Sequence, residues 1–280
     1  MIGLGAVGVA AVLKLHAAAV ARVLARGGGP ERLAGREQRI VFVLGSPRSG
    51  TTFLAGAIGA LPGFVDLGEV LPLKSAVPAL VGLPEDEAAL RVRRTLERVR
   101  TLALVRGLRG VEQTPEMAFL AGAAARAYPQ ARRIHLVRDG RDVVCSLLER
   151  GWLNANRSLE ADDVGGTYGE HARFWVEPDR VREFAEASDA TRAAWAWRRY
   201  VSAARSGDVV ELRYEELATA PERAAEALAE QLEIYPQLLL EHLSLAHARS
   251  VGRFRRDLTA DQLRDVEREA GPLLAELGYE

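Results

Sequence analysis

Short runs of consecutive apolar residues along the chain predict buried strands. The runs are IVFVLG at 40–45, IHLV at 134–137 and the aliphatic part of DVVELRY at 208–214. Continuous runs of this length are typical of parallel strands that are covered on both faces. Segments of helical character follow, among them 51–61 and 221–232. Strands alternating with helices at this spacing predict an α/β fold, with a central, mainly parallel sheet flanked by helices.

Further helices are predicted from amphipathic periodicity and from capping residues. The segments 85–106 and 189–206 predict long amphipathic helices. Asp139 directly precedes a segment of helical character, where its carboxylate suits an N-cap. Thr259 and Gln262 form a capping-box pattern at the start of a C-terminal helix. The apolar positions of that helix are Leu263, Val266, Leu273, Leu274 and Leu277.

The N-terminal segment is apolar and is followed by a linker. Residues 27–35 (GGGPERLAG) are rich in glycine, so we expect an apolar segment and linker over 1–35 and a folded domain over 36–280. Residues 1–13 carry no charged side chain, but a membrane span needs roughly 20 apolar residues. A secretory signal would carry positive charge before its apolar core, and none lies there. A packed helix, a membrane-associated segment and a cleaved leader remain open interpretations.

The composition is that of an ordinary globular protein, since 48% of the 280 residues are hydrophobic and 27% are charged. Lys and Arg number 37 against 38 Asp and Glu, so the cation surplus needed for sequence-independent nucleic-acid binding is missing. Cys145 is the single cysteine, and the five histidines lack metal-ligand spacing. We therefore expect no metal, no nucleic-acid partner and a cytoplasmic location, with membrane association through residues 1–25 as an alternative.

The most informative segment is GSPRSGTT at 45–52, between a predicted strand and a predicted helix. Backbone N–H groups and the helix dipole make such a turn an anion site. Its two glycines have the spacing of the nucleotide-binding pattern GxxxxGK[ST], and Thr52 fills the hydroxyl position. Thr51 replaces the lysine of that pattern, so the cation must come from Arg48. The loop suits a short anion held by Arg48, the two threonine hydroxyls and backbone amides, including those of Ser49 and Gly50.

PRSGTT after an apolar strand resembles the 5′-phosphosulfate loop of sulfotransferases that use PAPS (3′-phosphoadenosine 5′-phosphosulfate), particularly the tyrosylprotein-sulfotransferase-like branch. A second block, VRDGRD at 137–142, strengthens the resemblance. In that family an arginine that ends a strand and a serine eight positions later bind the 3′-phosphate, and Arg138 and Ser146 have this spacing. The alternative for Arg138 is an ion pair with Asp139 or Asp142.

Two weaker blocks follow in the family's order. LRYEEL at 212–217 resembles a strand-end segment whose tyrosine, here Tyr214, contacts adenine; a packing role is the alternative. SVGRFRR at 250–256 resembles the segment that closes over the nucleotide, and a solvated basic loop is the alternative. The resemblance covers roughly residues 38–280 and implies a P-loop-like three-layer sandwich and metal-free sulfuryl transfer from PAPS. It also implies nucleotide contacts from Gly252, Arg253 and Arg255, with Ser250 and Arg48 as catalytic candidates.

Glu69 is the preferred candidate for the general base. It lies 21 positions beyond Arg48, after one helix and a short strand, which returns the chain to the same edge of the sheet. It resembles the catalytic glutamate of the tyrosylprotein-type branch, and a surface or N-cap carboxylate is the alternative. His171 is the rival, because other members of the family use a histidine, although the residues around it match no family block.

Gln113 is a departure from the family pattern. The segment EQTP at 112–115 aligns with a family segment that often reads EKTP, so an amide stands where a lysine can assist the sulfuryl group. Lys74 or Arg255 are candidates to supply the missing cation. Without one, turnover could be low or absent.

Two other functions compete with sulfuryl transfer. One is a P-loop kinase or NTPase, disfavoured by Thr51 in the lysine position. The other is a non-catalytic PAP-binding or membrane-tethered protein. The acceptor remains undetermined: a small molecule, glycan, lipid or peptide would fit. We expect its pocket to form from 72–84, 151–180 and 234–247, where Trp152, Phe174 and Trp175 are either pocket or core residues.

Overall fold

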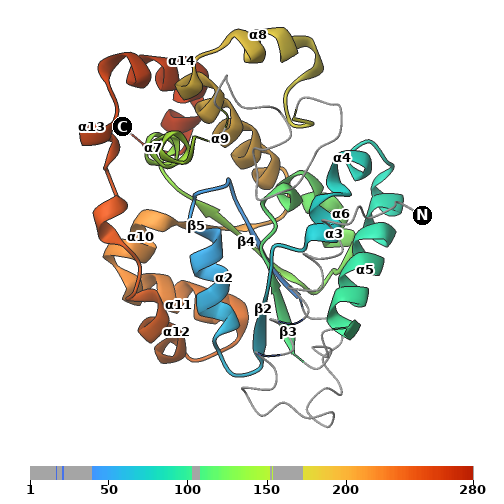
Figure 1. Cartoon of the computed structure of the whole chain (residues 1–280). Helices are drawn as coiled ribbons and strands as arrows, with labels where there is room; N and C mark the ends of the chain where they lie inside the picture. The colour runs from blue at the N-terminus through green and yellow to red at the C-terminus, as the bar shows by residue number, and fades with distance from the viewer. Residues whose placement is uncertain are drawn as a thin grey trace.

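A five-stranded parallel sheet forms the centre of the protein. The computed structural model describes residues 17, 21, 40–102, 108–151, 153 and 173–279. The strands lie in the order β2-β3-β1-β4-β5, and every neighbouring pair is parallel (Figure 1). Their bounds are β1 Ile40–Leu44, β2 Phe64–Gly68, β3 Arg109–Glu112, β4 Arg132–Val137 and β5 Val210–Arg213.

Strand β1 divides the interior into two cores because its side chains alternate between the faces of the sheet. All five of its residues are buried. Ile40, Phe42 and Leu44 belong to one apolar cluster, whereas Val41 and Val43 belong to the other. The predicted three-layer α/β sandwich is therefore confirmed.

The smaller core lies under helices on one face of the sheet, where α2, α10, α11 and α12 pack (Figure 1). These helices span Thr51–Gly59, Tyr214–Thr219, Pro221–Leu232 and Pro236–Leu243. Nearby, η4 spans Ala248–Ser250 and leads to α13, Phe254–Asp257.

The larger core contains most of the buried aromatic side chains and lies under the remaining described helices. The long helices α5, α9 and α14 span Glu85–Leu102, Asp189–Arg205 and Ala260–Glu276. The shorter ones are α3 Leu71–Lys74, α4 Val77–Leu80, η2 Pro115–Leu120, α6 Ala121–Ala127, α7 Gly140–Arg150, η3 Pro178–Arg180 and α8 Val181–Glu186.

Both predicted caps are confirmed. The Asp139 carboxylate accepts a hydrogen bond from the Arg141 backbone N–H at 2.9 Å at the start of α7. Thr259 and Gln262 form a reciprocal capping box at the start of α14. The described part of the helix predicted over 85–106 ends at Leu102, and the rest of that segment lies outside the described residues.

The predictions for the N-terminal segment and the linker fall almost entirely outside the described residues. Of residues 1–35, only 17 and 21 are described, so the expected boundary at 35–36 stays a prediction. Within the described part of the chain, no helix has both the length and the apolarity to cross a membrane.

Candidate active site

The carboxyl ends of the five parallel strands deliver the candidate residues to one edge of the sheet. In open α/β folds, ligands bind outside the carboxyl ends of the strands. The loop at 45–50 follows β1 and opens into α2. Glu69 follows β2, Gln113 follows β3, Arg138 follows β4 and Tyr214 follows β5.

The loop between β1 and α2 is a tight turn built on left-handed backbone. Gly50, the N-cap of α2, has φ +97°, and a Cβ placed on it would lie 2.7 Å from the Tyr214 ring. A Cβ at Gly45 would lie 2.7 Å from the carbonyl oxygen of Leu136. Arg48 also has a positive φ, +71°, which is uncommon for a residue with a side chain. The strand-loop-helix arrangement predicted from the sequence is confirmed.

Arg48 connects the loop to α7. Its Nε donates a hydrogen bond to the Ser146 Oγ at 3.0 Å. Burial lowers the pKa of the Arg48 guanidinium, and the neighbouring guanidiniums of Arg150 and Arg138 lower it further. Three guanidinium groups, from the loop, from the end of β4 and from α7, therefore lie near one another, and an anion would relieve their mutual repulsion.

Arg138 lies at the centre of the site and is 6% exposed. Its Nη1 donates to the Arg48 carbonyl oxygen at 3.2 Å, and its Nη2 donates to the Ser250 carbonyl oxygen at 2.6 Å. Its buried Nε has no hydrogen-bond partner among the described residues. The guanidinium carbon lies 4.6 Å from the centroid of the Tyr214 ring. Arg138 thus joins the anion loop to the segment at 250–256.

The alternative ion pair of Arg138 is not formed among the described residues. The Asp139 carboxylate instead pairs with Arg141 at 2.8 Å. Asp142 accepts hydrogen bonds from the backbone N–H groups of Gly252 at 2.7 Å and Phe254 at 3.0 Å. Burial raises the pKa of Asp142, whereas these two hydrogen bonds act against that rise.

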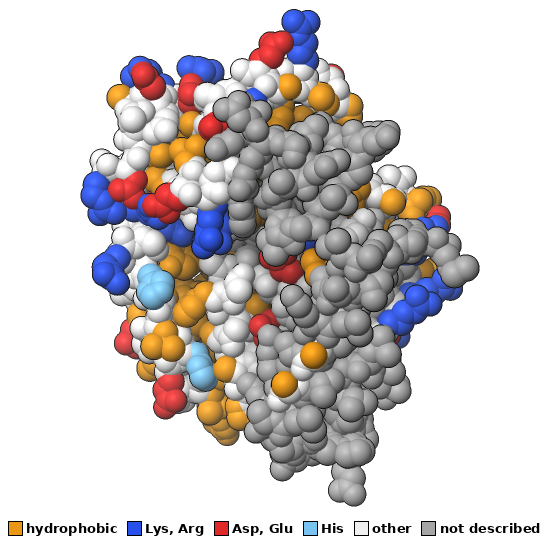
Figure 2. Space-filling model, viewed as in Figure 1, with side chains coloured by type: hydrophobic (Ala, Val, Ile, Leu, Met, Phe, Trp, Pro, Cys, Tyr) orange, Lys and Arg blue, Asp and Glu red, His pale blue; other side chains and the backbone are white. Residues whose placement is uncertain are grey.

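The segment at 250–256 closes one side of the site. The Ser250 hydroxyl lies 3.2 Å from the Tyr214 hydroxyl. Arg253 is held by Glu149, with Nη1 at 3.1 Å from Oε2, and by Asp257, with Nε at 2.7 Å from Oδ2. Basic and acidic side chains accordingly gather together where α13 lies (Figure 2). Arg255 stacks over Phe254, with its guanidinium carbon 4.6 Å from the ring centroid.

A second charged cluster surrounds Glu69. Its Oε2 lies 3.1 Å from the Lys74 Nζ, and the same Nζ lies 3.3 Å from Glu116 Oε1. Lys74 is 2% exposed and Glu116 is fully buried, whereas the Glu69 side chain is 22% exposed. Glu69 is thus the member of the cluster that solvent reaches most easily. Sequence analysis named Lys74 as a candidate cation but did not predict this ion pair.

Gln113, directly after β3, contacts the start of α2. Its Oε1 accepts a hydrogen bond from the Thr52 hydroxyl at 3.3 Å. The preceding residue, Glu112, is buried, and burial raises its pKa to about 8, with the carboxylates of Glu69 and Glu116 adding to the rise. The burial of Glu112 could not be predicted, because a single acidic residue in a short strand gives no signal of it in the sequence.

Of the remaining candidate residues, two are not described by the structure and two are. His171 and Trp152 lie outside the described residues. Trp175 is 2% exposed and packs edge-on against Phe184, with ring centroids 5.4 Å apart. Phe174 packs edge-on against Phe119 at 5.1 Å. Trp175 is therefore a core residue, and Phe174 packs on the same core.

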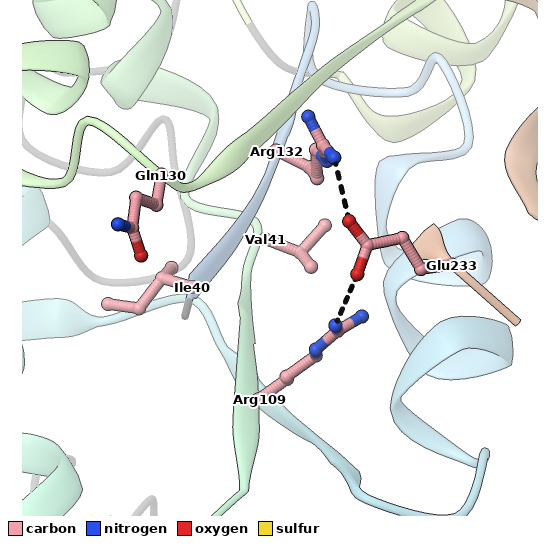
Figure 3. A pocket seen from close by; sticks show the side chains of 6 residues that line it. All are labelled: Ile40, Val41, Arg109, Gln130, Arg132 and Glu233. Carbon is pink, nitrogen blue, oxygen red and sulfur yellow. Dashed lines mark hydrogen bonds and ion pairs between the residues drawn. The ribbon is translucent and has the colours of Figure 1, made fainter. Parts of the chain in front are cut away.

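A separate pocket of about 330 Å³ lies at the opposite, amino-terminal edge of the sheet (Figure 3). Glu233 bridges two arginines there, at 3.6 Å from Arg109 and 3.1 Å from Arg132. This pocket does not involve the predicted anion loop. Among the described residues, no group of three or more His, Cys, Asp or Glu side chains could hold a metal ion.

The described residues form an α/β fold in which a glycine-containing loop connects its first strand to α2. A family model described as "Sulfotransferase family" matches residues 40–236. The chain therefore belongs to the sulfotransferase family, and this supports sulfuryl transfer as its general reaction.

Solved structures support the same fold. The sulfotransferase domain from the curacin biosynthetic pathway aligns with a TM-score of 0.56 at 15% identity, over 88% of this chain and 99% of that domain. The sulfotransferase STF1 from Mycobacterium tuberculosis H37Rv aligns with a TM-score of 0.50 at 16% identity, over 92% of this chain and 81% of that one. No curated protein matches the sequence significantly.

Proposed function

We propose that this protein transfers the sulfuryl group of PAPS to a hydroxyl or amine of an acceptor and releases PAP. The observation that carries the proposal is the joining of two anion-binding segments through Arg48 and Arg138. Arg48 reaches Ser146 at 3.0 Å, and Arg138 donates to the Arg48 carbonyl oxygen at 3.2 Å. A ligand with anionic groups at both its 5′ and 3′ ends suits this arrangement.

Each anionic end of the nucleotide has its own donors. The 5′-phosphosulfate would lie on the loop amides of Ser49 and Gly50, at the N-terminus of α2, with the hydroxyls of Thr51 and Thr52. The 3′-phosphate would take Ser146 and the Arg138 guanidinium, whose buried Nε has no partner among the described residues.

Tyr214, Gly252, Arg253 and Arg255 would complete the nucleotide site. The Tyr214 ring already stacks on Arg138. The Glu149 carboxylate raises the pKa of Arg253 and holds its guanidinium, so a phosphate would compete with Glu149 for this side chain.

Sulfuryl transfer is an in-line displacement, by analogy with phosphoryl transfer. The acceptor oxygen or nitrogen forms a bond to sulfur while the bond from sulfur to the 5′-phosphate oxygen breaks. Glu69 takes the acceptor proton, and PAP leaves with the electron pair of the broken bond. Arg48 and the threonine hydroxyls stabilise the charge that develops on the leaving phosphate oxygen. Ser250, whose carbonyl oxygen and hydroxyl contact Arg138 and Tyr214, positions this side of the site.

The position of Glu69 after β2 favours the tyrosylprotein-type branch over members that use a histidine base. We propose no metal in this reaction, because guanidinium and hydroxyl groups supply the charge stabilisation. A kinase or NTPase is disfavoured by the absence of a lysine from the loop, where Thr51 stands in its position. A small molecule, glycan, lipid or peptide is the expected acceptor, and a cytoplasmic or membrane-associated location fits each of these.

The experiment that tests this function is transfer of radiolabelled sulfuryl from PAPS to a panel of phenols, sugars, lipids and peptides. Wild type is expected to label at least one class, and Glu69→Gln is expected to lower the rate by about 10²- to 10⁴-fold while retaining PAP binding. Mg-ATP hydrolysis or phosphoryl transfer in place of sulfuryl transfer would favour the kinase alternative. PAP binding with no labelling of any acceptor would favour the non-catalytic alternative.

A further inference from the structure

Lys74 occupies an unusual position between two carboxylates beside the candidate base. It ends the short helix α3, five residues after Glu69. Its ammonium contacts Glu69 Oε2 at 3.1 Å and Glu116 Oε1 at 3.3 Å, although the side chain is only 2% exposed. Lysine is rarely buried, because removing its charge from water is unfavourable unless carboxylates compensate for it. Lys74 is also the only lysine in the described parts of the chain.

The surrounding polypeptide fixes this lysine in place. Leu73 and Val70 are fully buried, so α3 cannot slide along the core. The Val70 N–H donates to the Thr114 hydroxyl at 2.8 Å, which ties the end of β2 to the turn after β3. The distance between the Glu69 and Lys74 backbones is therefore set by packing as well as by the ion pair.

Gln113 stands at the position where the sulfotransferase segment that resembles EQTP often has a lysine. Its amide oxygen accepts from Thr52 at 3.3 Å and supplies no charge. The nearest described ammonium to Glu69 thus comes from α3 and not from the turn after β3.

We propose that Lys74 is the positioning residue of Glu69: its ammonium holds the carboxylate ionised and oriented for removal of the acceptor proton. This role rests on the proposed function of Glu69 as the base. Lys74 acts through Glu69 and does not itself contact the reacting atoms. An opposite charge within hydrogen-bond distance favours the ionised form of a carboxyl group.

Other titratable groups that face this pair come from β3, η2 and α9. Glu112 of β3 is fully buried and interacts electrostatically with Glu69 and Glu116. Glu116 of η2 shares Lys74 with Glu69 and accepts a hydrogen bond from the Tyr200 hydroxyl of α9 at 3.4 Å. Glu112 and Glu116 are thus two further carboxylates near Glu69, and Lys74 is the cation that contacts both Glu69 and Glu116.

The first test is the titration of the Glu69 carboxyl carbon by NMR in protein labelled with ¹³C-glutamate, assigned by comparison with Glu69→Gln. Lys74→Met is expected to raise the titration midpoint by about 1 to 3 pH units. Glu116→Gln, which removes a like charge, is expected to lower it or leave it in place. An unchanged midpoint in Lys74→Met, or a shift of both variants in the same direction, would overturn the inference. This readout needs no transfer activity, so it separates failure of the inference from failure of the proposed function.

The second test is the pH profile of sulfuryl transfer. In Lys74→Met the acid limb of the kcat/KM profile is expected to move to higher pH by the same amount as the titration midpoint. In Lys74→Arg, which keeps the positive charge, the limb is expected to lie close to its wild-type position. A uniform loss of kcat across the pH range, with no movement of the limb, would show a merely structural role. If Lys74→Met does not fold, the double variant Lys74→Met/Glu116→Gln replaces it. The double variant removes one charge of each sign, so the buried Glu116 carboxylate is not left without Lys74. Arg182→Met, on an exposed ion pair of α8, is the matched control for loss of one positive charge.

Discussion

The Nε of Arg48 donates a hydrogen bond to the Ser146 hydroxyl at 3.0 Å, across 98 positions of the sequence. Arg48 belongs to the turn after β1, and Ser146 belongs to α7, after β4. Because β1 and β4 are neighbours in the sheet, two segments predicted to bind different ends of one nucleotide meet directly. A ligand that engages one of them must change the contacts of the other.

Arg48→Gly is expected to separate ligand binding from stability. Glycine relieves the positive φ of +71°, worth about 1–2 kcal/mol. Loss of the hydrogen bond to Ser146 and the greater freedom of the unfolded chain oppose this by a similar amount. The unfolding free energy should therefore stay within about 1 kcal/mol of wild type in urea titrations without ligand.

The same variant should lose the stabilisation by PAP. At 100 times the dissociation constant, PAP should raise the unfolding free energy of wild type by about 2.7 kcal/mol. Arg182→Ala, whose side chain is 90% exposed, should retain this effect in full. An equal PAP effect in Arg48→Gly and wild type would show that the loop arginine does not contact the nucleotide.

Gly50→Ala and Gly56→Ala form a matched pair, the first at the N-cap of α2 and the second inside the helix. At Gly50 the methyl group would lie 2.7 Å from the Tyr214 ring on a backbone with φ +97°, whereas at Gly56 it meets nothing within 4 Å. We expect Gly50→Ala to lower the unfolding free energy by about 2 kcal/mol or more and to weaken PAP binding. Gly56→Ala should raise stability by about 0.5–1 kcal/mol. Similar effects of the two substitutions on thermal unfolding would contradict the description of the loop.

The burial of Glu112 leads us to predict a specific pH dependence of the unfolding free energy. Its pKa is raised from 4.5 to about 8 in the folded protein, chiefly by burial. Between these two values the folded state binds more protons than the unfolded state. The contribution of Glu112 to the unfolding free energy is therefore complete below pH 4.5, falls as the pH rises toward 8 and is lost above 8. Urea titrations between pH 6 and about 9 should show this loss.

Glu112→Gln is the variant that isolates this effect, because glutamine resembles the protonated acid. Its amide oxygen can still accept the hydrogen bond from the Thr114 N–H, which is 2.8 Å long in wild type. The variant should be the more stable protein at alkaline pH, and its stability should depend less on pH. A parallel pH dependence of the two proteins would place the ionised form of Glu112 in the folded state.

Asp142→Asn tests the anchoring of the segment at 250–256. The carboxylate accepts from the N–H groups of Gly252 and Phe254, and an amide can accept through one oxygen only. Loss of one such bond should cost about 1–3 kcal/mol of stability and weaken PAP binding without abolishing it. The checks are thermal unfolding and calorimetric titration with PAP. Unchanged affinity for PAP would mean that this segment does not take part in the nucleotide site.

The sequence predicted the strands that bear the anion loop and Arg138, because their apolar runs are continuous and their turns carry distinctive residues. Strand β3 was not predicted: RGVE is only four residues long, with charged side chains at both ends. Its burial comes from pairing with β1 and β2, which lie far from it in sequence. Long-range pairing of this kind leaves little trace in local periodicity.

The charged contacts of the site were the least predictable feature. The ion pair of Lys74 with Glu69 joins residues five apart, but Glu116 and Tyr200 reach the same cluster from other elements. Arg253, predicted from the resemblance to bind the nucleotide, is bound to Glu149 of α7, 104 positions earlier. Such partners depend on how helices pack on the sheet, and sequence spacing does not specify this.

Isothermal titration calorimetry of the purified protein with PAP and, separately, with Mg-ATP distinguishes a sulfotransferase nucleotide site from a kinase site. We predict that PAP binds more tightly than Mg-ATP and that Arg138→Ala, tested on folded protein, abolishes PAP binding. Tighter binding of Mg-ATP than of PAP would contradict the account, as would PAP affinity that does not depend on Arg138.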